Sequence, residues 1–291
     1  MKNILITGGS GFIGSRIADL LKKKNNVICT FYNSPIKIKN IKKIRLSITK
    51  KIIIKEKIDV VVHCASKTPA NCSKDSVVLN QNLKMMKNLL DLVKKKNIKS
   101  FVFLSSISAY GQINKKILFE SHKPNKPTIY GKSKLVCEKL LSNFSKKNKD
   151  FKFLSIRLPG VVGFGSESSG NFISKITKKI ISGKRIEVSN KLSYFNNIIF
   201  VDDLAKFVMK SINTKKLKYE FMNIASNKKM RIVDVIKFIY LRLNIKENIK
   251  WIKTENKSFC IDFSNALKCG YKPVSVKKSL INFTNDHLKR L

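Results

Sequence analysis

The chain has 291 residues, of which 43% are hydrophobic, and its formal net charge at pH 7 is +42. No apolar run approaches the roughly 18 residues of a membrane-spanning helix, so we expect a cytoplasmic protein with no membrane partner. Lysines occur in nearly every segment, only seven of the basic residues are arginine, and no nucleic-acid-binding motif is present. We therefore expect no nucleic-acid partner despite the charge.

A glycine-rich turn follows the first predicted strand. Residues 2–7 have the pattern of a buried strand, Gly9-x-Gly11-x-x-Gly14 comes next, and an apolar stripe at helical spacing follows. This order predicts a strand at 2–7, a tight turn, and a helix at 12–24.

That arrangement indicates a dinucleotide site and, with it, redox chemistry. Gly8 permits the tight turn, Gly11 permits close approach of a pyrophosphate, and Gly14 lets the helix pack closely on the strand. The phosphates then bind at the helix N-terminus, where free N–H groups and the helix dipole favour anions. The predicted cofactor contacts in this turn are Gly8, Gly11, Phe12, Ile13 and Gly14.

The second predicted strand, 26–31, bears on the choice of cofactor. It ends at Phe31, where NAD sites of this type place an Asp or Glu that accepts hydrogen bonds from the adenosine ribose. No acidic residue lies in the segment 20–55, whereas many basic residues do, so NADP(H) is favoured and NAD remains possible. No arginine follows the strand directly. Tyr32 and Asn33 stand there instead and are the expected contacts at this end of the cofactor.

Two further patterns carry chemistry. The predicted strand 100–105 leads into a serine cluster that includes Ser106, and parallel-sheet enzymes place their chemistry at the carboxyl ends of strands. Tyr130 and Lys134 are four residues apart and share one helix face, where an ammonium can lower the pKa of a phenol for acid–base catalysis. In so lysine-rich a chain, this pair alone would favour a solvated helix face. The serine cluster supports the catalytic interpretation.

Strands and helices alternate along the first half of the chain. We predict strands near 2–7, 26–31, 58–64, 100–105 and 151–157, and helices near 12–24, 82–96 and 130–147. This alternation predicts an α/β fold with a doubly wound parallel sheet. The pattern does not decide between helix and strand for residues 45–55.

Six motifs and the C-terminal tail occur in the order seen in a known family. They are TGGSGFIG at 7–14, DVVVHCA at 59–65, Asn82 with Asn-Leu-Leu at 88–90, SSISAYG at 105–111, YGKSK at 130–134, VDDLA at 201–205, and the tail 262–273. Along essentially its whole length the chain resembles extended short-chain dehydrogenases/reductases, in particular the nucleotide-sugar epimerase/dehydratase group.

The resemblance implies a Rossmann fold with a smaller C-terminal substrate-binding lobe, and it assigns roles to residues. Ser106 matches the catalytic serine that orients the substrate oxygen, Tyr130 the acid/base, and Lys134 its partner, which also binds the nicotinamide ribose. Further implied cofactor contacts are Ala65, Ser66, Asn82, Ser105, Pro159 and again Tyr130 and Lys134. Implied substrate contacts are Ser106, Ser108 and, near the start of a lobe helix, Asn171.

The resemblance also predicts organisation. Residues 1–160 and a return segment near 195–225 form the expected cofactor domain, and 161–194 and 226–291 the substrate lobe. A homodimer is expected through helices 82–96 and 130–147, where Leu83, Met86, Leu90 and Val93 form an apolar stripe. The alternative is that this stripe packs on the sheet of its own chain. The six cysteines lack metal-ligand spacing and are predicted to be reduced, mostly buried thiols with no metal site.

Departures from the family pattern narrow the reaction. Sugar 4,6-dehydratases carry an Asp-Glu pair after the catalytic residue, and the epimerase-reductases that make GDP-fucose carry a cysteine at the position of Ser108, so Ile107-Ser108 disfavours both. Asn196-Asn197 replace the Arg-Asp of many members. We favour NADPH-dependent reduction of a 4-keto nucleotide sugar, with 4-epimerisation using retained NAD as the alternative. A non-catalytic cofactor-sensing protein is less expected, because the catalytic set is intact.

Overall fold

The computed structural model describes residues 1–68, 75–166, 170–214, 219–254 and 258–288. These residues form two compact units. The first comprises Met1–Gly111, Pro124–Arg157 and Leu204–Met222, and the second comprises Gln112–Lys123, Leu158–Asp203 and Asn223–Leu291. The predicted division into a cofactor domain and a substrate lobe stays a prediction about what these units do.

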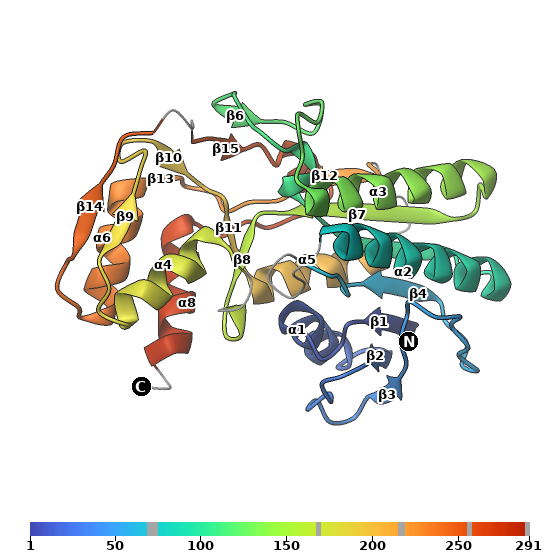
Figure 1. Cartoon of the computed structure of the whole chain (residues 1–291). Helices are drawn as coiled ribbons and strands as arrows, with labels where there is room; N and C mark the ends of the chain where they lie inside the picture. The colour runs from blue at the N-terminus through green and yellow to red at the C-terminus, as the bar shows by residue number, and fades with distance from the viewer. Residues whose placement is uncertain (69–74, 167–169, 215–218, 255–257, 289–291) are drawn as a thin grey trace. The chain divides into compact units, whose positions relative to one another are not determined.

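A seven-stranded sheet organises the first unit (Figure 1). Its strands, in spatial order, are β12 (Phe221–Asn223), β7 (Lys152–Leu158), β5 (Ser100–Ser106), β4 (Val60–His63), β1 (Asn3–Thr7), β2 (Asn26–Phe31) and β3 (Lys42–Arg45). The pairs β1–β2, β1–β4, β2–β3 and β4–β5 are all parallel. The chain winds outward in both directions from β1 and β4, which confirms the predicted doubly wound α/β fold.

The helices of this unit are α1 (Phe12–Leu21), α2 (Asp75–Lys96), α3 (Ile129–Lys147) and α5 (Val201–Asn213), with a short 3₁₀ turn η2 at Ile107–Tyr110. The prediction placed α2 seven residues too late, at 82. The missed first turn belongs to the same apolar stripe, because Val78 is fully buried and lies at helical spacing from Met85 and Leu89.

The undecided segment 45–55 is neither a helix nor a long strand. Strand β3 ends at Arg45, and the chain then runs irregularly to β4. Three isoleucines of this segment, Ile48, Ile52 and Ile54, are buried in the core beneath α2. The Asn88 amide donates to the carbonyls of residues 48 and 50, at 3.0 and 2.8 Å. The buried isoleucines and the Asn88 hydrogen bonds therefore order a segment that forms no regular backbone hydrogen bonds of a helix or sheet.

The predicted dimer stripe packs within its own chain. Met86, Leu90 and Val93 are buried, and they share one core with Cys137 and Leu141 of α3 and with the sheet. This is the alternative interpretation of the stripe, because these side chains do not form a free apolar face. A homodimer stays a prediction that the stripe no longer supports.

In its described residues, the second unit contains four short strand pairs and four helices. The pairs are β8 (Gly160–Val162) with β11 (Ile198–Phe200), β9 (Ile186–Val188) with β14 (Ile249–Trp251), β10 (Tyr194–Phe195) with β13 (Met230–Arg231), and β6 (Ile117–Leu118) with β15 (Cys260–Ile261). The helices are α4 (Phe172–Ile181), α6 (Ile232–Leu243), α7 (Ser264–Lys268) and α8 (Val276–Leu288). Apolar side chains from α4, α6 and α8 form its core.

No helix in the described part of the chain is long and apolar enough to cross a membrane.

Candidate active site

The glycine turn lies where the sheet order reverses, between β1 and β4. Gly8 has φ +71°, a left-handed conformation that glycine adopts without strain. A β-carbon added there would lie 2.9 Å from the backbone of Ala65, directly after β4. Ligands of open α/β sheets bind in the crevice outside such a reversal point. The position of the predicted dinucleotide turn therefore fits its proposed ligand.

Helix α1 begins against this turn. Gly11 is its N-cap and makes no side-chain capping hydrogen bond. A β-carbon at Gly14 would lie only 2.2 Å from the carbonyl oxygen of Gly8, so the first helical turn sits directly on the loop. A helix start without a side-chain cap has N–H groups to offer an anion. Its first residues, Phe12 and Ile13, are half-buried, and the arrangement fits a pyrophosphate.

We expect Gly14→Ala to lower both stability and dinucleotide affinity, because the new methyl group meets backbone that cannot rotate away. The expected loss is about 1–3 kcal/mol in free energy of unfolding. Gly11→Ala is the matched comparison, since its nearest contact would be at 3.3 Å. It should weaken dinucleotide binding with little loss of stability. Denaturant unfolding and calorimetric titration measure both quantities, and a Gly14→Ala protein of wild-type stability would contradict this geometry.

The adenosine end of the cofactor is predicted to lie at the end of β2. Tyr32 and Asn33 are exposed there. The sheet register pairs Phe31 with Arg45 of β3, and the Arg45 Nε donates to the Tyr32 carbonyl at 3.3 Å. The sequence prediction counted Arg45 only as one basic residue in a long segment. The parallel pairing of β2 and β3 brings this exposed guanidinium beside the strand end that lacks a carboxylate.

The predicted acid–base pair, Tyr130 and Lys134, lies on α3. Thr128 caps this helix, and its hydroxyl accepts from the Gly131 N–H at 3.2 Å. The Lys134 Nζ lies 5.4 Å from the centre of the Tyr130 ring. It also donates to the Leu104 carbonyl at 2.9 Å, which holds the buried ammonium at the end of β5. Tyr130 and Lys134 therefore share one face, as their spacing predicts.

The Lys134 ammonium packs against a stacked pair of aromatic rings. The Lys134 Nζ lies 4.8 Å from the centre of the Phe103 ring, and the His63 ring stacks on Phe103 at 5.6 Å. His63 shares a 2.7 Å hydrogen bond with the Thr7 hydroxyl. Burial, and secondarily the Lys134 charge, lowers the pKa of His63 to about 3. The imidazole is therefore neutral at physiological pH, and the ammonium has no charged histidine beside it.

Ser106 ends β5 and is the N-cap of the 3₁₀ turn η2. Its hydroxyl accepts from the Ser108 N–H at 3.1 Å and donates to the Ser108 hydroxyl at 3.1 Å. The neighbouring Ser105 hydroxyl is buried and has no hydrogen-bond partner among the described residues. An unpaired buried hydroxyl is costly without a ligand. Ser105 thus fits its predicted role as a cofactor contact, which stays a prediction.

Asn82 has a structural role that its sequence match did not indicate. Its amide accepts from the Lys67 N–H at 2.8 Å and donates to the Lys67 carbonyl at 2.9 Å and to the Ser133 hydroxyl at 3.0 Å. It also accepts from the Ser66 hydroxyl at 3.4 Å. Asn82 therefore ties the loop after β4 to α3, and any direct contact with a cofactor stays a prediction.

The predicted contacts of the second unit are engaged in packing. Asn171 caps α4 by accepting from the Ser174 N–H at 2.9 Å, and its amide nitrogen donates to the Val161 carbonyl at 3.0 Å. Pro159 is buried. Asn196 accepts from the Ile261 N–H and donates to the Ile261 carbonyl, at 2.8 and 2.9 Å. Asn196 therefore anchors β15 at the position where many family members have arginine.

The cysteines do not form a further site in the described chain. Cys29, Cys64, Cys137, Cys260 and Cys269 are unpaired thiols. Cys72 lies outside the described residues. Burial raises the pKa of Cys29 and of Cys137 to about 12, so both are unreactive thiols at neutral pH. Within the described ranges, no group of three or more His, Cys, Asp or Glu residues could hold a metal ion.

Comparison with known proteins decides the family. A sequence model described as the NAD dependent epimerase/dehydratase family matches residues 4–225. The chain belongs to this family. The match confirms the resemblance inferred from the ordered motifs, and it covers the glycine turn, the serine cluster and the Tyr130–Lys134 pair.

Individual relatives share the whole length of the chain. A putative UDP-glucose 4-epimerase from Methanocaldococcus jannaschii is 25% identical over 308 residues, 97% of each chain. The structure of a UDP-N-acetylglucosamine 4-epimerase from Methanobrevibacter ruminantium in complex with UDP-N-acetylmuramic acid aligns with TM-score 0.84 and 23% identity over 100% of this chain and 99% of that one. A UDP-glucuronic acid 4-epimerase from Bacillus cereus in complex with NAD aligns with TM-score 0.84 and 23% identity over 99% of both chains. These structures confirm the fold.

Proposed function

We propose that the protein catalyses reversible hydride transfer at carbon 4 of a nucleotide sugar, with 4-epimerisation as the net reaction. The observation that carries the proposal is the buried Lys134 ammonium beside the Tyr130 ring at the carboxyl end of β5. The 4-epimerases among its relatives support the choice of reaction and the use of NAD. This reverses the order of the two reactions expected from the sequence.

Three side chains of this chain take part in the reaction, and Tyr130 carries the proton. Bound at the glycine turn, NAD would supply the hydride acceptor and donor for carbon 4, and epimerisation would require hydride return to the opposite face of the sugar. The Tyr130 phenol takes the proton of the carbon 4 hydroxyl and gives it back, acting as general base and then general acid. Lys134 stabilises the phenolate through its charge. The Ser106 hydroxyl, which now donates to Ser108, turns to the sugar oxygen and orients it.

A second candidate is NADPH-dependent reduction of a 4-keto nucleotide sugar. The specific observation that favours it is the end of β2, where Phe31 replaces a ribose-binding carboxylate and Arg45 stands beside it. A 2′-phosphate would meet a guanidinium there, and residues 20–55 contain no acidic side chain that would repel it. An epimerase keeps its cofactor through the cycle, whereas a reductase exchanges it at every turnover, so cofactor retention separates the two reactions.

The Arg45 proposal makes its own prediction. Arg45→Ala should weaken NADPH binding about tenfold or more, because a charge-assisted hydrogen bond contributes about 1.5–3 kcal/mol. NADH binding should be unchanged. Lys43→Ala is the matched control, since Lys43 is an exposed cation on the same strand that pairs away from the strand end, with Cys29. Equal losses for NADH and NADPH in calorimetric titration would contradict a 2′-phosphate contact.

Native mass spectrometry followed by a nucleotide-sugar panel tests the proposed function. We expect the purified protein to retain NAD and to interconvert two sugars that differ at carbon 4 without net change of cofactor. NADPH consumption with a 4-keto sugar would show that the reaction is reduction and not epimerisation. A protein that binds neither nucleotide would contradict both reactions.

A further inference from the structure

Helix α3 carries a buried acid on the face of the acid–base pair. Glu138 follows Lys134 by four residues and Tyr130 by eight, so all three lie along one side of the helix. The Glu138 side chain is only 4% exposed. A buried carboxylate is costly unless it is paired and hydrogen-bonded. Its partners must therefore explain why it is there.

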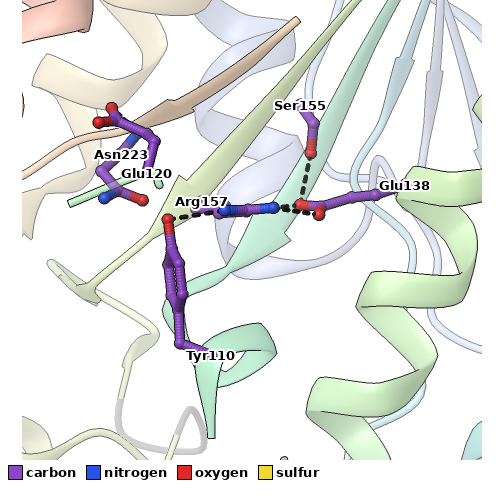
Figure 2. A network of polar contacts seen from close by, with 6 residues as sticks. All are labelled: Tyr110, Glu120, Glu138, Ser155, Arg157 and Asn223. Carbon is purple, nitrogen blue, oxygen red and sulfur yellow. Dashed lines mark hydrogen bonds and ion pairs between the residues drawn. The ribbon is translucent and has the colours of Figure 1, made fainter. Parts of the chain in front are cut away.

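Strand β7 supplies those partners (Figure 2). The Arg157 Nε and Nη2 donate to the two carboxylate oxygens of Glu138 at 3.0 and 2.7 Å. The Ser155 hydroxyl donates to Oε1 at 2.9 Å. This two-pronged contact is directional as well as charged, so it fixes the rotation and height of α3 relative to the strand.

The same guanidinium reaches the serine turn. The Arg157 Nη1 donates to the Tyr110 hydroxyl at 2.6 Å, and the guanidinium carbon lies 4.6 Å from the centre of the Tyr110 ring. Tyr110 is the last residue of η2, the turn that begins directly after Ser106. One side chain thus connects the helix of Tyr130 and Lys134 with the turn of Ser106.

A second contact joins the two elements at their other end. A β-carbon at Gly131 would lie 2.0 Å from the Ser108 carbonyl oxygen, so the first turn of α3 rests directly on η2. Two separate contacts restrict the rotation of α3 relative to η2 more than a single contact would. Ser106 and Tyr130, the two hydroxyl groups that must meet one substrate oxygen, flank the second contact, because Ser106 is two residues before Ser108 and Tyr130 is directly before Gly131.

We propose that Arg157 is a positioning residue that holds the Ser106 turn and α3 in register through Tyr110 and Glu138. Stability alone does not account for this network, because buried ion pairs are often no more stabilising than apolar side chains of the same volume. The inference rests on the proposed function in one respect, namely that Ser106 and Tyr130 act on the same oxygen.

Tyr110→Phe tests the proposal with the least disturbance, because it removes one hydroxyl and keeps the ring and the ion pair. We expect kcat to fall about 10- to 100-fold, since small misplacements of reacting groups have effects of this size. KM and cofactor affinity should change little. Tyr240→Phe is the matched control, because it removes another buried phenol, which donates to the Asn248 carbonyl in the second unit at 3.1 Å. Its kcat should equal that of the wild type.

Arg157→Lys should lower kcat in the same way, because lysine keeps the positive charge but lacks the planar guanidinium that donates to Glu138 and Tyr110 together. If the role were only structural, Tyr110→Phe and Tyr240→Phe would lose thermal stability alike and both would keep the wild-type kcat. That result would overturn the proposal.

Hydrogen–deuterium exchange provides a readout that does not depend on the reaction. In Tyr110→Phe we expect faster exchange confined to residues 104–111 and 129–138, whereas Tyr240→Phe should leave both segments unchanged. Unchanged exchange in Tyr110→Phe would overturn the proposal. If no nucleotide sugar is converted by the wild type but this local change occurs, the proposed reaction fails and the positioning role stands.

Discussion

Tyr130→Phe is expected to abolish turnover while leaving cofactor affinity nearly unchanged. The substitution removes the hydroxyl that moves the proton and keeps the ring that packs beside Lys134. General acid–base catalysis contributes about 100- to 10,000-fold, so kcat should fall by that factor. Steady-state kinetics with the sugar identified in the panel measure the rate, and calorimetry measures the cofactor.

The unchanged cofactor affinity is the control in this experiment, because it shows that the site is still formed. A Tyr130→Phe protein that keeps more than about a tenth of the wild-type rate would refute the assignment, since loss of a general acid–base should lower the rate at least about 100-fold.

Lys134→Met is expected to lower both the rate and the cofactor affinity. Its ammonium stands beside the Tyr130 ring, and the resemblance to the family predicts for it a hydrogen bond to the nicotinamide ribose as well. A hydrogen bond to a charged group contributes about 1.5–3 kcal/mol, which corresponds to about 10- to 100-fold in Kd. Turnover should fall further, because the phenolate loses its counter-charge.

Lys132→Met is the matched control, since Lys132 lies on the same helix and is exposed. It should retain wild-type rate and affinity. If Lys134→Met lost only thermal stability, the buried lysine would be a packing residue and the catalytic interpretation would fail.

The parts of the fold that depend on local patterns could be predicted from the sequence. β1 and β2 are continuous apolar runs, and their predicted bounds agree with the structure to within a residue. The irregular segment after β3 could not be predicted, because its buried isoleucines are held by Asn88 of a helix some forty residues away. Its order comes from tertiary contacts that have no local period.

The candidate site divides in the same way. The glycine turn and the Tyr130–Lys134 pair are local motifs, so both could be identified directly from the sequence. Arg157 could not be assigned, because its partners Glu138 and Tyr110 come from two different elements, α3 and η2. Glu138 did offer a signal, since it continues the four-residue spacing of Tyr130 and Lys134. Arg45 became informative only through the register of two strands.

The most direct test of hydride transfer at carbon 4 is proton NMR of the reaction in D₂O. Hydride transfer carries the carbon 4 hydrogen to the nicotinamide and back without contact with solvent, whereas proton abstraction exchanges it. We predict that the carbon 4 epimer of a nucleotide sugar forms and that its carbon 4 position contains protium only. Deuterium at carbon 4, or no conversion of any nucleotide sugar by the cofactor-loaded protein, would contradict the account.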